Sequence, residues 1–363
     1  MIISEIVKFL EDLAPIEYSL DWDNSGLQVG ELNKEIKKVG IALTPTVKII
    51  EEAISKGCNL LITHHPLIFR AIKSINTNQP IGKSIELALK NDLTIYTLHT
   101  NFDSVSTGLN YTIAKDLGLD NIDILSESGN IEMLKLVTFV PEEYTLKVVN
   151  AISEAGAGNV GKFSHRSYIA AGIATFAQGD NKIEDLETPN KESEDRLEIV
   201  VPKNKLKQVI NALNESHPYD EVVYDLYKLE NNKETYGIGT IGEFYTPFKL
   251  AEIIKMIKRN LNISNLTYVG ESNKMIEKVA ICTGSGCDFM KLAKNKGADL
   301  YITGDIKYHT AIDAQEIDMA LIDASHYSTE IIAIPFLTKY LKNNFHKKIE
   351  IVELVEKNPF SYA

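Results

Sequence analysis

Two adjacent histidines, His64 and His65, stand where an α/β protein would place metal ligands. They follow the apolar segment Leu60–Thr63 and precede Pro66. Neighbouring side chains of a strand point to opposite faces, so both imidazoles can reach one cavity only where the strand has ended. Ligands of α/β sheets bind beyond the carboxyl ends of the strands. Taken alone, the pair could equally be two hydrogen-bonded structural histidines.

A second group of candidate ligands lies in the last third of the sequence. His326 and Glu330 are four residues apart at the start of a predicted helix, which places them on one face, roughly 5–6 Å apart at Cβ. Asp103 ends the corresponding turn of the first third. Three imidazoles and two carboxylates exceed the needs of one tetrahedral ion but suit two ions that share a carboxylate. The sequence therefore predicts a dinuclear metal site formed by His64, His65, Asp103, His326 and Glu330.

Three further residues are candidates for supporting roles. His99 could be a ligand or could orient a ligand through a hydrogen bond, and we favour the second role. Asp305 and His309 follow the strand that corresponds to the one before His64, but the ligand set is complete without them. His99 and His309 are the candidates for moving a proton during catalysis.

Two loops admit two interpretations each. The segment 283–286, TGSG, could be a tight turn or could cradle an anion with backbone N–H groups, and we favour the tight turn. The segment 22–27, WDNSGL, holds the only tryptophan and could form the rim of a site or anchor a loop.

Strand-like and helical segments alternate in both terminal thirds, which predicts an α/β fold. In the first third we expect strands at 39–43, 59–63 and 94–99, with helices at 47–56, 81–90 and 108–117. In the last third we expect strands at 278–283, 299–303, 319–324 and 349–354, with helices at 288–295, 307–315 and 329–342. Pro335 should kink the last helix.

The two thirds also repeat each other. Lys38-Val39, Ile41, Lys56-Gly57, Leu60 and Ile62-Thr63 match identical residues that lie 240 positions later. Unrelated βαβ units share a hydrophobic pattern but not identical residues at one fixed offset. The repeat predicts a duplicated α/β core with pseudo-twofold symmetry.

The middle of the chain has a different order of elements. Its pattern is βαββαβ, the signature of a ferredoxin-like α+β domain. We expect this domain to be inserted at 127–235 between the first half of the core, 1–126, and the second half, 236–363.

Composition and charge exclude several classes of protein. The 363 residues are 44% hydrophobic and 24% charged, the balance of a soluble multidomain protein. The net charge of -12 argues against nonspecific nucleic-acid binding. No segment reads as a signal peptide or a membrane span, so we expect a cytoplasmic protein. The cysteines Cys58, Cys282 and Cys287 form no Cys-x-x-Cys pair, which argues against disulfides and thiolate zinc sites.

These motifs together resemble those of the Nif-three-like proteins, also called GTP cyclohydrolase I type 2 homologs. The resemblance rests on WDNSGL at 22–27, THHP at 63–66, HTNFD at 99–103, Gly304-Asp305 and HYSTE at His326–Glu330. It covers both thirds, and the middle segment resembles the PII/CutA-like domain of longer bacterial members. Many members carry an aspartate in the first strand-to-helix turn, where this chain has Ala42-Leu43-Thr44.

The resemblance implies two divalent metal ions per subunit. It implies that His65, Asp103 and Glu330 hold one ion, that His64 and His326 hold the other, and that Glu330 bridges them. It further implies a toroidal homohexamer with the sites facing an internal cavity. The sequence does not select among Zn, Fe, Mn, Co and Ni.

Two functions are compatible with this reading. The first is a metal-dependent hydrolase that acts on a nucleotide, in which one ion acidifies water to give hydroxide and the other polarises the electrophile. The second is a metal-handling or ligand-sensing regulatory protein without enzymatic activity. Turnover that vanishes on metal removal would favour the enzyme.

Overall fold

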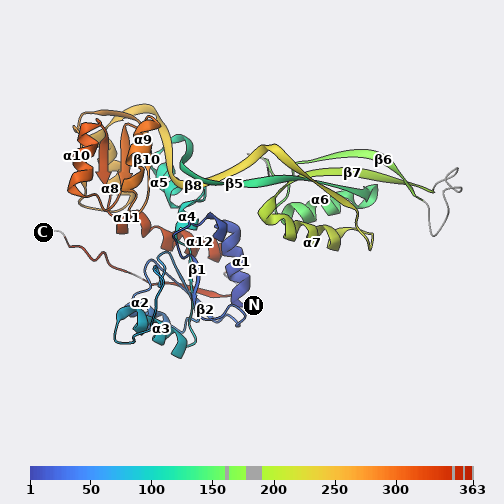
Figure 1. The fold of residues 1–363 in the computed structure, drawn as a ribbon, viewed down its shortest axis with the longest axis horizontal. Helices are drawn as coiled ribbons and strands as arrows, with labels where there is room; N and C mark the ends of the chain where they lie inside the picture. The colour runs from blue at the N-terminus through green and yellow to red at the C-terminus, as the bar shows by residue number, and fades with distance from the viewer. Residues whose placement is uncertain (160–162, 177–189, 346–347, 355, 362–363) are drawn as a thin grey trace. The chain divides into compact units, whose positions relative to one another are not determined.

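The computed structural model describes residues 1–363 apart from 160–162, 177–189, 346–347, 355 and 362–363. The chain has two compact units, one formed by Met1–Gly129 with Tyr236–Ala363 and the other by Asn130–Thr235. Both units combine sheets with helices, so the predicted mixed α/β class is confirmed (Figure 1). Among the described residues, no helix is both long and apolar enough to cross a membrane.

The first unit contains a five-stranded sheet built mainly by the first third of the chain. Its order is β1-β4-β3-β2-β13, and all neighbours are parallel except the edge strand β1. Every residue of β3 is buried, as expected for a parallel strand covered on both faces. The strands are β1 (Gly26–Val29), β2 (Lys38–Ala42), β3 (Leu60–Thr63), β4 (Thr94–Thr97) and β13 (Glu350–Glu353).

Helices cover both faces of this sheet. On one face, α2 (Val47–Ser55) and α3 (Pro80–Lys90) bury their apolar sides against β3 and β4 in a single core cluster. The opposite face carries α1 (Ile3–Leu13), whose Glu11 accepts a hydrogen bond from the Tyr96 hydroxyl. The result is a three-layer α/β/α arrangement in which the central strands β3 and β4 are buried throughout.

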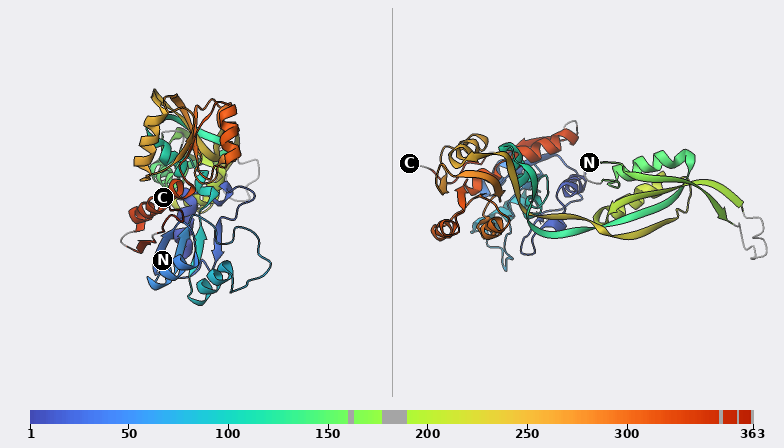
Figure 2. Two further views of the ribbon diagram at one scale, coloured as in Figure 1. Left: turned by 90° about the vertical axis from the view of Figure 1, so that its left-hand side faces the viewer. Right: turned by 90° about the horizontal axis from the view of Figure 1, so that it is seen from above.

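The second sheet of this unit is built mainly by the last third of the chain. Within the unit its order is β8-β10-β11-β12-β9, with β10, β11 and β12 parallel to one another. Helices α5 (Leu109–Leu117) and α8 (Leu250–Asn260) pack on one face, while α9 (Met290–Asn295) and α10 (Tyr308–Glu316) pack on the other (Figures 1 and 2). The strands are β9 (Thr267–Val269), β10 (Met275–Ile281), β11 (Leu300–Thr303) and β12 (Ala320–Asp323).

The two sheets share a register that matches the sequence repeat. Val39 pairs with Leu60 in the first sheet, and Val279 pairs with Leu300 in the second. Both residues of the second pair lie 240 positions after those of the first. Each sheet also ends in an antiparallel edge strand next to the third parallel strand. The strand ends of the two halves therefore present equivalent loops.

One expectation about the last helix is wrong. The single helix expected at 329–342 is two helices, α11 (His326–Glu330) and α12 (Ala333–Phe345). Pro335 is the third residue of α12, and it does not kink a continuous helix. A proline is tolerated in the first turn because the N–H group it lacks has no partner within the helix there.

The second unit has the element order β5-α6-β6-β7-α7-β8. Strands β6, β7 and β5 pair antiparallel, and one core cluster joins the two helices to β5 and β7 (Figure 2). This is the βαββαβ order expected from the sequence. The elements are β5 (Asp120–Pro141), α6 (Thr145–Glu154), β6 (Ser167–Phe176), β7 (Asn190–Pro202), α7 (Leu206–Ser216) and β8 (Tyr224–Lys249).

Candidate metal centre

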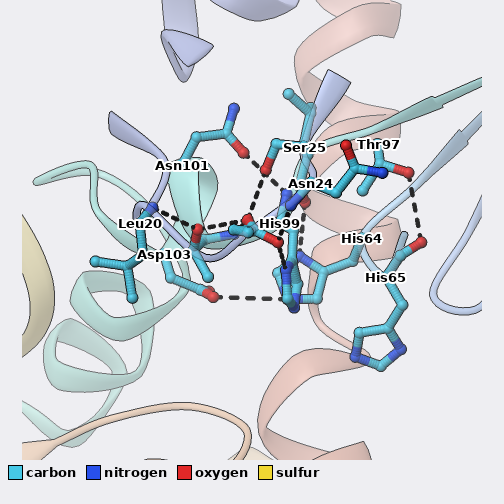
Figure 3. A network of polar contacts seen from close by, with 12 residues as sticks. Leu20, Asn24, Ser25, His64, His65, Thr97, His99, Asn101 and Asp103 are labelled. Atoms are coloured by element: carbon cyan, nitrogen blue, oxygen red, sulfur yellow. Dashed lines mark hydrogen bonds and ion pairs between the residues drawn. The ribbon is translucent and has the colours of Figure 1, made fainter. Parts of the chain in front are cut away.

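The five candidate ligands come together at the carboxyl ends of strands from both sheets of the first unit. His64 and His65 follow β3, and Asp103 ends the short helix α4 (Thr100–Asp103) after β4. His326 and Glu330 are the first and last residues of α11, which follows β12. Figure 3 shows His64, His65, His99 and Asp103 close together. The structure thus joins residues from the two ends of the chain in one site.

Glu330 is the centre of this group. Its Oε2 atom lies 2.8 Å from Nε2 of His65 and 2.9 Å from Nε2 of His326. Its Oε1 atom lies 3.7 Å from Nε2 of His64, and Oδ2 of Asp103 lies 3.8 Å from the same nitrogen. His64, His65 and Glu330 each offer an atom within 4.8 Å of the others, a spacing compatible with a shared metal ion.

His64 carries the clearest sign of a missing partner. Its side chain is fully buried, and its Nδ1 atom lies 2.8 Å from the carbonyl oxygen of Leu98. That carbonyl can only accept, so Nδ1 donates, and Nε2 presents a lone pair to the site when the ring is neutral, the form that a metal ion requires. Nε2 is buried without a hydrogen-bond partner among the described residues. Buried polar atoms are rarely left so, and a metal ion would satisfy this one.

The other two imidazoles are oriented in the same way. Nδ1 of His65 lies 2.9 Å from the Thr44 hydroxyl, and Nδ1 of His326 lies 2.7 Å from a carboxylate oxygen of Asp305. Each ring is therefore fixed with Nε2 toward Glu330. Such hydrogen bonds on the distal nitrogen are typical of metal-ligating histidines. Asp305 thus contacts a candidate ligand and lies outside the ligand group itself.

Burial and neighbouring charges shift the pKa values of all five candidate ligands. Burial opposes a charge on His64, but the carboxylates of Asp103 and Glu330 outweigh it and raise the pKa of His64 to about 9. Burial likewise opposes a charge on His326, and Glu330 and Asp305 raise its pKa to about 9. Burial lowers the pKa of His65 and raises the pKa of Asp103 to about 6. Burial would also raise the pKa of Glu330, but the imidazoles hold it well below its usual value.

The TGSG segment is a tight turn that makes room for Glu330. Gly284 has a positive φ of 67°, and a Cβ atom there would lie 2.1 Å from Oε1 of Glu330. The backbone N–H of Gly284 donates to the Thr329 hydroxyl, and that of Gly286 donates to the Thr303 hydroxyl. These N–H groups already have partners within the protein, so the anion cradle that the sequence left open does not form from them.

The two proton-transfer candidates occupy different places. His99 lines the cavity beside the ligand group, and its ring centroid lies 5.4 Å from that of His64 and 5.9 Å from that of His65. His309 is exposed on α10 and does not line this cavity. The structure therefore brings His99 to the site and leaves His309 outside it.

Asp23 is a functional candidate that the sequence reading did not single out. Its Oδ1 atom lies 2.7 Å from Nδ1 of His99, while its Oδ2 atom accepts from the hydroxyls of Thr100 at 2.5 Å and Ser25 at 2.8 Å. Burial opposes the charge of Asp23, but these hydrogen bonds and His99 hold its pKa well below the usual value. The segment 22–27 is thus part of the site. Two signals in the sequence pointed to this segment, the polar turn residues beside Trp22 and the match of WDNSGL to the family motif.

Comparison with known proteins identifies the family. The model of the Duf34/NIF3 (NGG1p interacting factor 3) family matches residues 1–359. The chain belongs to this family. A Duf34/NIF3 relative from Bacillus subtilis, named "GTP cyclohydrolase 1 type 2 homolog", is 36% identical, and the match covers 99% of this chain and 98% of that protein.

Solved structures of Duf34/NIF3 relatives share the fold. A Bacillus cereus protein related to NIF3 has a TM-score of 0.87 and 35% identity, with 100% of this chain and 99% of that chain covered. The Staphylococcus aureus protein SA1388 has a TM-score of 0.69 and 29% identity, with the same coverage. The family inferred from the sequence motifs is therefore confirmed, while the likeness of the middle segment to a PII/CutA-like domain stays a prediction.

Proposed function

We propose that this Duf34/NIF3 protein binds two divalent metal ions and is a metal-dependent hydrolase that acts on a nucleotide. The buried, unpartnered Nε2 atom of His64, which faces Asp103 and Glu330, carries the proposal. The ligand set would be His64, His65, Asp103, His326 and Glu330. Both oxygens of Glu330 face imidazoles, so this carboxylate is placed to bridge two ions. The name of the relatives, GTP cyclohydrolase 1 type 2 homolog, supports a nucleotide as the substrate class.

The distances suggest how the ligands are divided between the ions. Oε2 of Glu330 is close to His65 and His326, whereas Oε1 and Asp103 are close to His64. The family resemblance implies the other division, with His65 and Asp103 on one ion. Both divisions use the same five residues, and only the pairing differs.

His99, oriented by Asp23, would transfer the proton during catalysis. When bound, divalent ions lower the pKa of water and polarise the group under attack. Asp23 holds Nδ1 of His99, so Nε2 is the ring nitrogen available to accept a proton within the cavity and return it to the leaving group. The Asp23 carboxylate lies 2.7 Å from Nδ1 and keeps the ring oriented while the proton is on Nε2. Thr100 and Ser25 keep the carboxylate in place.

The test compares two histidine variants on metal-loaded protein. His99→Ala should lower nucleotide turnover by about 10²–10⁴-fold, the usual contribution of general acid–base catalysis, with metal content retained. His309→Ala is the matched control because this exposed histidine lies outside the cavity. Glu330→Ala should lose metal and activity together. Metal content is measured by mass spectrometry and turnover by chromatography of the products. A fully metallated protein that turns over no nucleotide or phosphoester would refute the hydrolase and favour metal handling.

A further inference from the structure

The cavity beside the candidate ligands has an aromatic rim exposed to solvent. Its volume is about 450 Å³. The side chains of Trp22 and Phe69 line it while remaining 59% and 46% exposed, and their ring centroids lie 5.8 Å apart at an angle of 71°. Large aromatic side chains left exposed at a concave site are typical of ligand-binding surfaces, because a bound ligand would remove them from water.

The aromatic wall continues toward the candidate ligands. The His99 ring lies 6.4 Å from the ring of Trp22 and 6.2 Å from that of Phe69, and it faces both edge-on. It also lies 5.9 Å from the His65 ring. A flat group that packs against Trp22 and Phe69 would therefore lie beside the residue proposed to move the proton. Further apolar side chains line the same cavity: Leu20, Pro66, Ile238 and Phe289.

The cavity lacks the groups that usually bind phosphate chains. Its ionisable oxygen and nitrogen groups are the carboxylates of Asp103 and Glu330 and the imidazoles of His65, His99 and His326. Of the described residues that line it, none is lysine or arginine. Proteins recognise phosphate chains mainly through the charge and the donors of those two residue types. The lining thus matches a flat, uncharged ring better than an oligophosphate.

We propose that this cavity recognises its substrate through a nucleobase-like heteroaromatic ring that packs against Trp22 and Phe69, and that the side chains lining the cavity contribute little to binding the phosphate chain. This inference rests on the proposed function, which supplies the nucleotide as substrate class. It adds that the protein recognises the base of that nucleotide. Stacking on aromatic side chains tolerates different bases because every base has a π face. Without metal ions, a nucleoside should therefore bind about as tightly as its triphosphate, with little dependence on salt.

Trp22 is the only tryptophan, so its fluorescence reports directly on the rim. Protein freed of metal by a chelator is titrated with guanosine, adenosine, GTP and ribose 5-phosphate, so that no metal ion adds to the affinity for phosphate. We expect saturable quenching by both nucleosides and by GTP, with dissociation constants of guanosine and GTP within about threefold, and none by ribose 5-phosphate. Phe69→Ala should weaken binding of both ring ligands by about tenfold, and Phe69→Tyr should restore it. Arg70→Ala, an exposed neighbour that does not line the cavity, is the control and should change nothing.

Two results would overturn ring recognition. One is affinity that rises steeply with the number of phosphates and is lost in Arg70→Ala. The other is no saturable quenching by any ring ligand. Binding is read without turnover, so the two proposals fail separately: ring binding without hydrolysis would refute only the hydrolase, and hydrolysis with phosphate-dominated binding would refute only ring recognition.

Discussion

The Nε2 atoms of His65 and His326 lie 3.3 Å apart, although the two residues are 261 positions apart in the sequence. Both atoms face Oε2 of Glu330. Two donor nitrogens and one carboxylate oxygen around a common point form half of the proposed site, and His64 with Asp103 form the other half. This pairing differs from the one that the family resemblance implies, and it can be tested by removing ligands in order.

Asp103→Ala should remove one ion and leave about one of two per chain, since it takes away a ligand of only one ion. Adding His65→Ala should then remove the second ion if the distances give the pairing, because His65 belongs to the remaining ion. On the same pairing, adding His64→Ala to Asp103→Ala should cause little further loss of metal. The metal content per chain of the two double variants decides between the two pairings. The reverse pattern would support the pairing implied by the resemblance, and unchanged content in every variant, Glu330→Ala included, would refute the ligand set.

Metal uptake should release protons at neutral pH. In the metal-free protein the pKa values of His64 and His326 are raised to about 9, so both imidazoles are charged at pH 7. A metal ion requires them neutral, so binding at pH 7 should release about two protons and affinity should rise with pH until about 9. Calorimetry in buffers of different ionisation enthalpy measures the number of protons. A binding enthalpy that is the same in every buffer at pH 7 would contradict this prediction.

Gly284→Ala should disrupt the site without touching a ligand. The new methyl group would meet Oε1 of Glu330, and the positive φ of this residue disfavours any side chain. We expect a loss of about 1–3 kcal/mol in the free energy of unfolding, measured by denaturant titration, together with weaker metal binding. Gly297→Ala is the matched control because Gly297 also has a positive φ but has open space around its Cβ position. Equal metal binding in both variants would show that Glu330 does not need the space at Gly284.

Glu356 positions His65 indirectly, through the loop after β2. Its Oε1 atom accepts hydrogen bonds of 2.7 Å from the backbone N–H groups of Leu43 and Thr44, and the Thr44 hydroxyl contacts Nδ1 of His65. Glu356→Ala should lower metal affinity by about 10–100-fold, the usual cost of losing a group that orients a ligand. Glu356→Gln keeps an acceptor oxygen and should restore most of the affinity. Glu353→Ala, an exposed neighbour, is the control. If Gln fails to rescue while the fold is intact, the carboxylate acts through its charge and not as a positioning acceptor.

The strands, and the meeting of the five candidate ligands in one place, could be predicted because their signals are local or periodic. Buried parallel strands read as continuous apolar runs, and the repeat located the corresponding strand ends in both halves. The contacts of Asp23 and Glu356 with the site gave no such signal, since His99 lies 76 residues from Asp23 and Leu43 and Thr44 lie 312–313 residues from Glu356. A carboxylate in a loop has no preferred spacing to a distant partner, so only the folded chain reveals its role. Pro335 was misread for a related reason, because its effect depends on where the helix begins.

The last prediction concerns the independence of the first unit. Deleting Asn130–Thr235 and joining Gly129 to Tyr236 through a short Gly-Ser linker should leave a folded protein that binds metal. Gly129 lies against Tyr236, since a Cβ atom there would come within 2.4 Å of the Tyr236 hydroxyl oxygen, so a short linker spans the new connection. The retained part of β8 still pairs with β10, and all five candidate ligands remain. A short loop costs little closure entropy, so the truncated chain should unfold cooperatively and bind as much metal as the full chain.

The Asn130–Thr235 segment has its own buried core and should fold when expressed alone. Circular dichroism, thermal unfolding and metal content measure these outcomes. A truncated chain without a cooperative transition would show that the core depends on the second unit, and a folded truncated chain without metal would place part of the site outside the five residues named here.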